Sequence, residues 1–276
     1  MKQLTQGQPV EYIVYNDAST DETKQILNNF KDVRIINGIK NIGLIAARNI
    51  LMQEARGEYI LSLDDDSNIV NKNFMHNIEN YFIENPRCAV IATRIFWGKT
   101  FPDNYTINEQ ITTVKSFVGC GHIWRKSAWL NIVEYPEWFQ FYGEEDFASI
   151  NLFINNWEVN YVPNIVVHHR VDLLARKGDK DNFRRAKLSL RSGWFLILLF
   201  YPLMSIPRIM IYTIWVKIKN RVFKGDFNAL WVIFAAQWDV IVNMPKILSN
   251  RNPMTKKEFI TYKKLEETKV YWKPNL

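Results

Sequence analysis

Short apolar runs alternate with helix-spaced apolar positions along the first half of the chain. Glu11–Tyr15, Val33–Ile36 and Tyr59–Leu63 are rich in β-branched, aromatic and other apolar residues, which is typical of β-strands. Helical spacing covers Ile42–Arg56, and Gly57 ends that pattern. Strands that alternate with helices predict an α/β fold, doubly wound around a mostly parallel sheet.

Polar residues stand where the predicted strands end. Asp17 follows the first strand, and Asp64–Asp66 follows Tyr59–Leu63. Ligands of α/β sheets bind beyond the carboxyl ends of the strands, so this edge is the predicted binding site. The run Tyr59–Leu63 is almost wholly apolar, and we expect a strand covered on both faces. Ser19 precedes Glu22 by three residues, which predicts a capping box on the first helix.

The second half of the chain carries a different pattern. Trp194–Val216 is apolar and aromatic, but Pro202, Pro207 and Arg208 interrupt it. A membrane-spanning helix needs about 20 predominantly apolar residues with few charges. We therefore expect interfacial helices over this run and over Phe227–Leu248.

Charge divides the chain in the same way. Residues 1–169 contain 14 Lys and Arg against 20 Asp and Glu, whereas residues 170–276 contain 21 against 8. An acidic half can hold metal ions, and a basic, aromatic half can meet an anionic surface. We expect a catalytic, ligand-binding domain over residues 1–170 and a helical, membrane-associating extension over 171–276. Two distant cysteines exclude a disulfide scaffold, and no secretory signal is visible.

The three adjacent carboxylates of Asp64–Asp66 repel one another unless a cation or open water relieves their charge. Mg²⁺ and Mn²⁺ prefer oxygen ligands, and Mg²⁺ is usually held by one or two carboxylates together with substrate phosphates. The run therefore indicates a metal–diphosphate site. A solvated turn is the alternative, because Asp is common in turns.

A second acidic group, Glu144–Asp146, follows Gly143 and precedes helix-spaced apolar residues, which places it in the first turn of a helix. One of these carboxylates can serve as a general base, although negative charge at a helix N-terminus is stabilising by itself. His168 and His169 follow the apolar run Tyr161–Val167. A histidine at this strand end can complete a metal shell or have a structural role only.

Together these motifs resemble the family 2 glycosyltransferases of the GT-A fold. The resemblance covers residues 11 to about 170, and Leu63–Ser67 resembles the family's DXD region. The other segments that carry it are Val14–Asp21, Asn41–Gly43 with Ala47–Asn49, Ala55–Ile60, and Tyr142–Asp146 with Pro163 and Val167–Arg170. It implies a UDP-, dTDP- or GDP-linked sugar donor, a divalent cation (Mn²⁺ or Mg²⁺) and inversion at the anomeric carbon. The basic tail resembles members that build bacterial surface polysaccharides, which implies a saccharide or lipid-linked acceptor.

The resemblance also assigns roles to single residues. The residues expected to contact the nucleotide-sugar are Asp17, Arg48, Asp64 and Asp65. The expected metal ligands are Asp66, then His169, then His168. Asp146 would be the general base, but alignment on the helix that follows selects Glu145 instead, so both stay candidates.

The family pattern begins about one strand and one helix before Glu11, and its first strand lies centrally in the sheet. We expect neighbouring strands to lack that partner, and a truncated, non-catalytic binding or scaffold subunit is the alternative function. A glycoside hydrolase with paired carboxylates, a nucleotidylyltransferase and a DNA-binding protein fit the motifs less well. Peripheral contact through residues 184–248 at the inner face of the cytoplasmic membrane is expected, with no nucleic-acid partner.

Overall fold

The structure is a computed structural model that describes residues 5, 7, 9–103, 105, 107–171 and 182–269. The strands are β1 (Tyr12–Asn16), β2 (Val33–Asn37), β3 (Tyr59–Leu63), β4 (Ser67–Ile69), β5 (Cys88–Trp97), β6 (Thr112–Thr113), β7 (Gly121–Arg125) and β8 (Glu158–His169). The α-helices are α1 (Thr23–Leu27), α2 (Leu44–Glu54), α3 (Phe74–Glu84), α4 (Lys126–Trp129), α5 (Glu144–Ile154), α7 (Asn182–Phe200), α8 (Ile206–Asn220), α9 (Asn228–Val242), α10 (Met244–Ser249) and α11 (Lys256–Lys264). Short 3₁₀ helices are η2 (Glu137–Phe139), η3 (Leu203–Ser205) and η4 (Val222–Lys224).

The main sheet is mixed. Its strands follow the order β3-β7-β5-β8-β4, and β6 pairs with β8 beside that path. β5 and β8 are parallel, whereas β7 runs antiparallel to both β3 and β5, and β4 and β6 run antiparallel to β8. The expectation of a mostly parallel sheet is therefore wrong, because periodicity reveals strands but not the direction that their connections impose.

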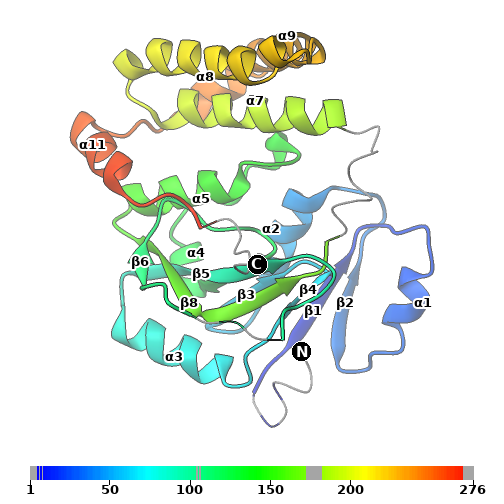
Figure 1. Cartoon of the computed structure of the whole chain (residues 1–276). Helices are drawn as coiled ribbons and strands as arrows, with labels where there is room; N and C mark the ends of the chain where they lie inside the picture. The colour runs from blue at the N-terminus through cyan, green and yellow to red at the C-terminus, as the bar shows by residue number, and fades with distance from the viewer. Residues whose placement is uncertain are drawn as a thin grey trace.

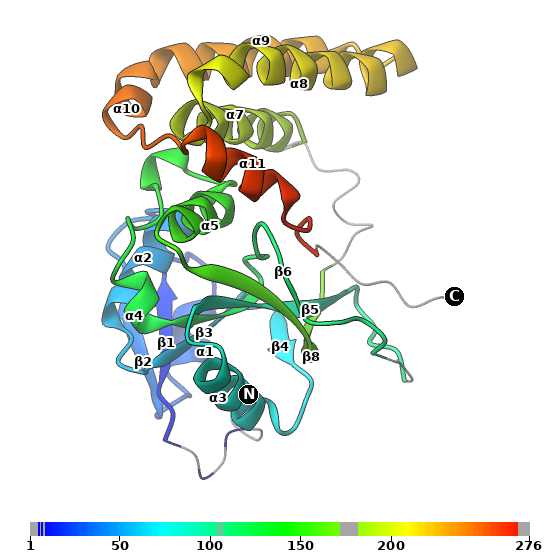
Figure 2. The same ribbon diagram turned by 90° about the vertical axis from the view of Figure 1, so that its left-hand side faces the viewer.

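Helices cover both faces of this sheet, which agrees with a doubly wound α/β fold (Figures 1 and 2). On one face, Phe74, Ile78 and Phe82 of α3 pack with Ile91 and Ile95 of β5. The other face forms a larger core that includes residues of β7, α5, α7, α9 and α11. The two predicted units, 1–170 and 171–276, thus share one hydrophobic core across the described residues.

β1 and β3 belong to different sheets. In the part of the chain that the structure describes, β1 pairs with β2 alone, in parallel, and β3 pairs with β7 alone. Ile60 packs against the larger core, and Tyr59, Leu61 and Leu63 pack against the smaller one, so both faces of β3 are covered as expected. All five residues are nevertheless only half-buried, because β3 is an edge strand among the described residues.

The first helix begins later than the sequence pattern indicated. α1 starts at Thr23 and has no side-chain cap, so the predicted capping box at Ser19 is wrong. The Ser19 N–H instead donates to Asn16 Oδ1 at 3.1 Å in the turn that ends β1. A capping box does occur at the start of α11, where Thr255 and Glu258 cap each other.

The apolar run over Trp194–Val216 is divided between α7 and α8. Pro202 lies between the two helices, and Pro207 lies in the first turn of α8, where a missing N–H costs little. None of the helices in the described residues is long and apolar enough to cross a membrane. α8 and α9 lie side by side over α7, on the side away from the sheet (Figures 1 and 2).

Candidate functional site

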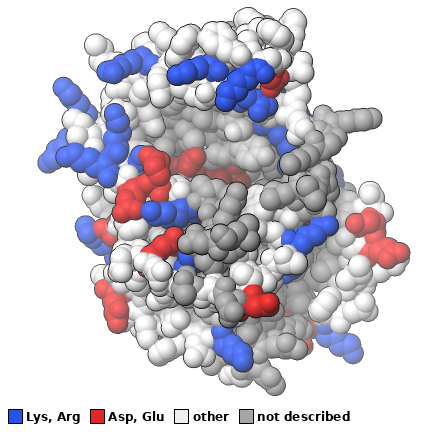
Figure 3. Space-filling view, in the orientation of Figure 1, with Lys and Arg blue, Asp and Glu red and all other residues white. Residues whose placement is uncertain are grey.

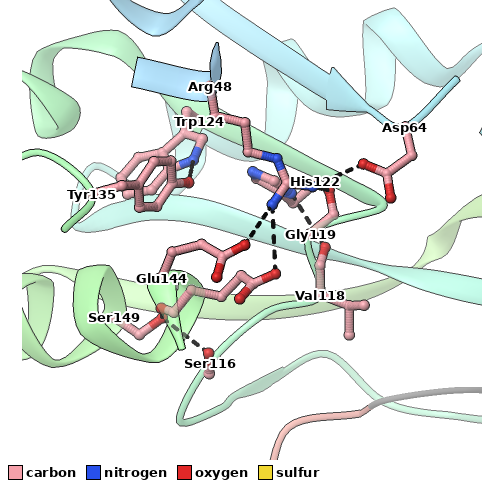
Figure 4. Close-up of polar contacts among 11 residues, drawn as sticks. Arg48, Asp64, Ser116, Val118, Gly119, His122, Trp124, Tyr135, Glu144 and Ser149 are labelled. Carbon is pink, nitrogen blue, oxygen red and sulfur yellow. Dashed lines mark hydrogen bonds and ion pairs between the residues drawn. The ribbon is translucent and has the colours of Figure 1, made fainter. Parts of the chain in front are cut away.

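The guanidinium of Arg48 joins the elements of the predicted site (Figure 4). Arg48 lies on α2 and is 7% exposed. Its Nη2 donates to Asp64 Oδ1 at 2.8 Å and to the Gly119 carbonyl at 3.1 Å, and its Nη1 donates to Glu144 Oε1 at 3.0 Å. Glu145 Oε1 lies 3.6 Å from Nη1. One cation thus connects the end of β3, the start of α5 and the loop before β7.

This arrangement leaves more negative than positive charge around the guanidinium. Burial would lower the pKa of Arg48, but the charges of Glu145, Asp64 and Glu144 raise it above its ordinary value, so Arg48 stays cationic. Burial, together with the charge of Glu144, raises the pKa of Glu145 to about 8, and the charge of Arg48 opposes this rise. When several carboxylates share one cation, their mutual repulsion makes it unfavourable for all of them to be ionised at once.

The three acids of α5 point to different surroundings, because successive helical residues are about 100° apart. Gly143, with φ of 89°, precedes the helix, and the acids occupy its first turn as predicted. Glu144 is 2% exposed, and its Oε2 has no hydrogen-bond partner among the residues that the structure describes, whereas the Glu145 side chain is 22% exposed beside Arg48. Asp146 is exposed, yet dense surroundings raise its pKa while a hydrogen bond with Ser116 opposes that rise.

Asp64 and Asp66 lie at the two ends of the turn between β3 and β4, and His169 lies across from this turn at the end of β8. His169 Nε2 lies 2.9 Å from Asp66 Oδ1, and one ligand atom from each of the three residues lies within 4.8 Å of the others. Two carboxylate oxygens and an imidazole nitrogen form a donor set that suits Mn²⁺ and other first-row divalent ions. Asp65 lies exposed in the same turn.

His168 lies apart from this group. Successive residues of a strand point to opposite faces, so His168 and His169 of β8 face different sides. His168 Nε2 lies 2.7 Å from the Gly98 carbonyl, and its ring lies 5.3 Å from that of Phe101. The structure therefore brings His169, and not His168, to Asp66.

Asp17 is engaged by backbone donors. Its Oδ1 accepts from the Ile42 N–H at 2.7 Å, and its Oδ2 accepts from the Gly43 N–H at 2.9 Å. These bonds tie the end of β1 to the start of α2, the helix that carries Arg48. The contact of Asp17 with a nucleotide stays a prediction.

Two residues at the site escaped the sequence analysis. A Cβ atom on Gly119 would collide with Glu145 Oε1 and with the Arg48 guanidinium, so a side chain there would displace one of these groups. His122 is 1% exposed, and burial, followed by the charge of Arg48, lowers its pKa to about 3, which keeps it neutral. Gly119 and Gly121, on either side of Cys120, are the sequence feature that could have indicated close packing at this position. Burial raises the pKa of Cys120 to about 12, which argues against a nucleophile there.

The loop that leads into α5 is held by α7. Gln140 and Tyr142 both have φ of 66°, a conformation that side chains disfavour and that the surroundings must stabilise. Arg191 donates to the Phe139 carbonyl, and Ser192 Oγ donates to the Phe141 carbonyl at 3.3 Å. The helical layer thus braces the segment that positions the three acids.

Figure 3 shows that the molecule is hollowed between the helical layer and the sheet domain, with acidic side chains lining the hollow. The exposure of Asp146 together with its raised pKa is consistent with a place in such a recess.

Replacing Glu145 by Gln should change how stability depends on pH. The pKa of Glu145 is raised from 4.5 to about 8 in the folded chain, so its contribution to stability is full below the lower value and is lost as the pH rises through the upper one. We expect the melting temperature of Glu145→Gln to rise relative to wild type between about pH 5 and about pH 9. Glu84→Gln, on an exposed position of α3, is the control for the loss of one carboxylate outside the site. A constant difference for Glu145→Gln would contradict the argument.

Replacing Arg191 by Met should destabilise the fold, because the Phe139 carbonyl and Arg191's other partner, Asp239, lose a charged donor. The expected loss in the free energy of unfolding is about 2–3 kcal/mol in urea titrations. Lys257→Met on the exposed face of α11 should stay within about 0.5 kcal/mol of wild type. Equal losses in the two variants would show that Arg191 does not brace the loop.

Two curated relatives match part of the chain. An uncharacterized glycosyltransferase of Haemophilus influenzae is 37% identical over 82 residues, which are 28% of this chain and 32% of that protein. The UDP-Glc:alpha-D-GlcNAc-diphosphoundecaprenol beta-1,3-glucosyltransferase WfaP of Escherichia coli is 40% identical over 95 residues, 33% of this chain and 37% of that protein. The matched segment thus spans about a third of each relative.

Solved structures share the fold at low sequence identity. GalNAc-T7 with UDP, GalNAc and Mn²⁺ matches with a TM-score of 0.57 at 15% identity, over 74% of this chain and 43% of that one. S. aureus TarS 1–349 with UDP has a TM-score of 0.51 at 18% identity, covering 71% and 60%. The mannosyltransferase PcManGT of Pyrobaculum calidifontis, with GDP-Man and Mn²⁺, has a TM-score of 0.51 at 13% identity, covering 85% and 66%.

The sequence profile of one family, described as Glycosyl transferase family 2, matches residues 2–138, a segment that includes β1 to β7 with Arg48 and the Asp64–Asp66 turn. The acids of α5 and His169 lie beyond the matched residues. The family match and the two relatives agree, and residues 2–138 have the sequence pattern of glycosyl transferase family 2 on a fold that glycosyltransferase structures share.

Proposed function

We propose that the protein is an inverting, metal-dependent glycosyltransferase. It would move a sugar from a nucleotide-sugar to a saccharide or lipid-linked acceptor in cell-surface polysaccharide synthesis. The observation that carries the proposal is the contact of one guanidinium, that of Arg48, with Asp64 on the predicted donor side and with Glu144 on the predicted acceptor side. Such a bridge sets the distance between a leaving group and a base.

Asp64, Asp66 and His169 are the residues that would hold Mn²⁺ or Mg²⁺. A divalent ion at this position offsets the negative charge that develops on a departing nucleoside diphosphate. Asp65, exposed in the same turn, and Asp17 would contact the donor. We assign Arg48 a positioning role rather than a donor contact, since its hydrogen bonds already go to Asp64, Gly119 and Glu144.

Inverting transfer needs a carboxylate opposite the leaving group to accept the proton of the acceptor hydroxyl. The Glu145 carboxylate lies beside the Arg48 guanidinium, which also pairs with Asp64. The Asp146 carboxylate instead contacts Ser116. The geometry favours Glu145 as the base and makes Asp146 the alternative. A pKa near the reaction pH suits a group that must accept a proton and later release it.

The ligands and substrates named for similar proteins support the proposed donor and acceptor classes. TarS binds UDP and UDP-GlcNAc and PcManGT binds GDP-Man in their structures, so the base of the donor stays open. The E. coli relative is named for transfer from UDP-Glc to a diphosphoundecaprenol-linked sugar, which supports a lipid-linked acceptor. The proposal includes peripheral contact of residues 184–248 with the inner face of the cytoplasmic membrane.

A non-catalytic binding or scaffold subunit is the second candidate function. It is favoured by the separation of β1 from β3, because both strands end at the edge where a nucleotide would bind. Nucleotide binding distinguishes the two candidates.

Calorimetry with UDP, dTDP and GDP, each with and without Mn²⁺, tests the donor site. We expect one nucleotide to bind only with Mn²⁺, and Asp66→Asn to weaken that binding at least tenfold, because the diphosphate loses its bridge to the protein. Asp32→Asn, an exposed residue between α1 and β2, should leave binding unchanged. Absence of binding by a folded wild-type protein would favour the scaffold candidate.

The pH profile of transfer tests the base. Since Glu145 must be ionised to accept a proton, kcat/KM should rise with pH and level off above an apparent pKa near 8. Glu145→Gln should lower kcat by roughly 10²–10⁴-fold, whereas Asp146→Asn should lower it far less. Loss of activity in Asp146→Asn, with activity kept in Glu145→Gln, would assign the base to Asp146.

A further inference from the structure

The outer side of α9 is aromatic and open to solvent. Trp231, Phe234 and Trp238 recur at helical spacing and are 69%, 61% and 65% exposed. The opposite side of the same helix packs on α7 through small and β-branched residues, namely Ala229, Val232, Ile233, Ala236 and Val240. The exposed aromatic residues are thus not needed for the packing that fixes α9 in the fold.

Neighbouring elements extend this surface. Tyr212 and Trp215 of α8 are 64% and 51% exposed, and Phe227, just before α9, is 68% exposed. Together these six residues form what we call the outer aromatic face: Tyr212, Trp215, Phe227, Trp231, Phe234 and Trp238. α8 and α9 are the outermost layer of the molecule in both ribbon views, so no described element covers this face (Figures 1 and 2). Exposed apolar surface on this scale marks a binding site.

The charges around the face are positive. Arg208, Lys219, Lys224 and Lys246 are all exposed, and Figure 3 shows Lys and Arg along the helical layer. Residues 203–249 contain two carboxylates, and both are paired: Asp226 with Arg221 at 2.9 Å, and Asp239 with Lys187 of α7 at 3.0 Å. The exposed rim is therefore basic.

We propose that the outer aromatic face docks on an anionic lipid bilayer, with α8 and α9 lying in the plane of the interface. Trp and Tyr favour the boundary between acyl chains and headgroups, and nearby Lys and Arg are attracted to anionic headgroups. A second copy of the chain fits less well, because a symmetric contact would bring the two basic rims together. Neither α8 nor α9 is long enough to cross a bilayer, so the contact is with one leaflet.

Docking in this way deepens the proposed function, and its meaning for transfer rests on that function. The sheet domain lies on the other side of α7 from the outer aromatic face, so the acids of α5 and the Asp64–Asp66 turn stay on the aqueous side (Figures 1 and 2). A nucleotide-sugar reaches them from water, while a lipid-linked acceptor extends from the bilayer past the helical layer.

Sedimentation with vesicles tests the surface without any nucleotide. We expect wild type to bind vesicles of phosphatidylglycerol and phosphatidylethanolamine, and to bind phosphatidylcholine vesicles at least tenfold less. Trp231→Ser with Trp238→Ser should lower the affinity at least tenfold, and Lys219→Glu with Lys224→Glu should lower it several-fold, less so in high salt. The matched control is Ile83→Ser with Leu130→Ser, equally exposed on α3 and after α4, which should bind as wild type does.

Three results would overturn the proposal: no vesicle binding, equal loss in the control pair, or a dimer in solution that the α9 substitutions convert to a monomer. The last would assign the face to a second copy of the chain. Circular dichroism and Mn²⁺-dependent nucleotide binding of each variant separate these outcomes from misfolding. Vesicle binding that persists without nucleotide binding would reject the proposed transferase and keep the docking surface.

Discussion

The buried guanidinium of Arg48 is the interaction on which the rest of the site depends. A buried cation requires carboxylate partners, and its partners come from β3 and α5, which are far apart in sequence. Gly119 leaves the space that this contact occupies, and Asp17 fixes the start of the helix that carries Arg48. Several local features therefore follow from one need, which is to pair a charge that water does not reach.

The C-terminal helices take part in the same arrangement. α7 closes the larger core, and Phe200 of α7 packs on Phe147 of α5 with ring centroids 5.3 Å apart. The Arg191 guanidinium donates a hydrogen bond to the Phe139 carbonyl in the loop before α5, and it forms an ion pair with Asp239 of α9. The acids are thereby connected through packed helices to the outermost layer, so the extension is part of the site's framework rather than an appendage.

The sequence indicated local features of the fold better than long-range ones. β3 was predicted with its observed bounds, and the acids of α5 were placed in a first helical turn, because period, glycine and charge are local signals. The direction of β7, the split between β1 and β3, and the half-burial of β3 depend on which strands become neighbours. No pattern within Tyr59–Leu63 reports that.

The candidate site shows the same division. Asp64, Asp66 and His169 were recognisable because acids and histidines at strand ends are few, and strand alternation decides between His168 and His169 only once the sheet is known. Arg48 and Glu144 are 96 residues apart in the sequence, and no local residue pattern predicts that they pair. Glu144 forms the closer ion pair with Arg48, at 3.0 Å, whereas Glu145 lies 3.6 Å from the guanidinium and keeps a partly exposed side chain, which is why we propose Glu145 as the base. The sequence motif identifies the three acids Glu144–Asp146 as a group, and only the position of the Arg48 guanidinium in the fold distinguishes them from one another.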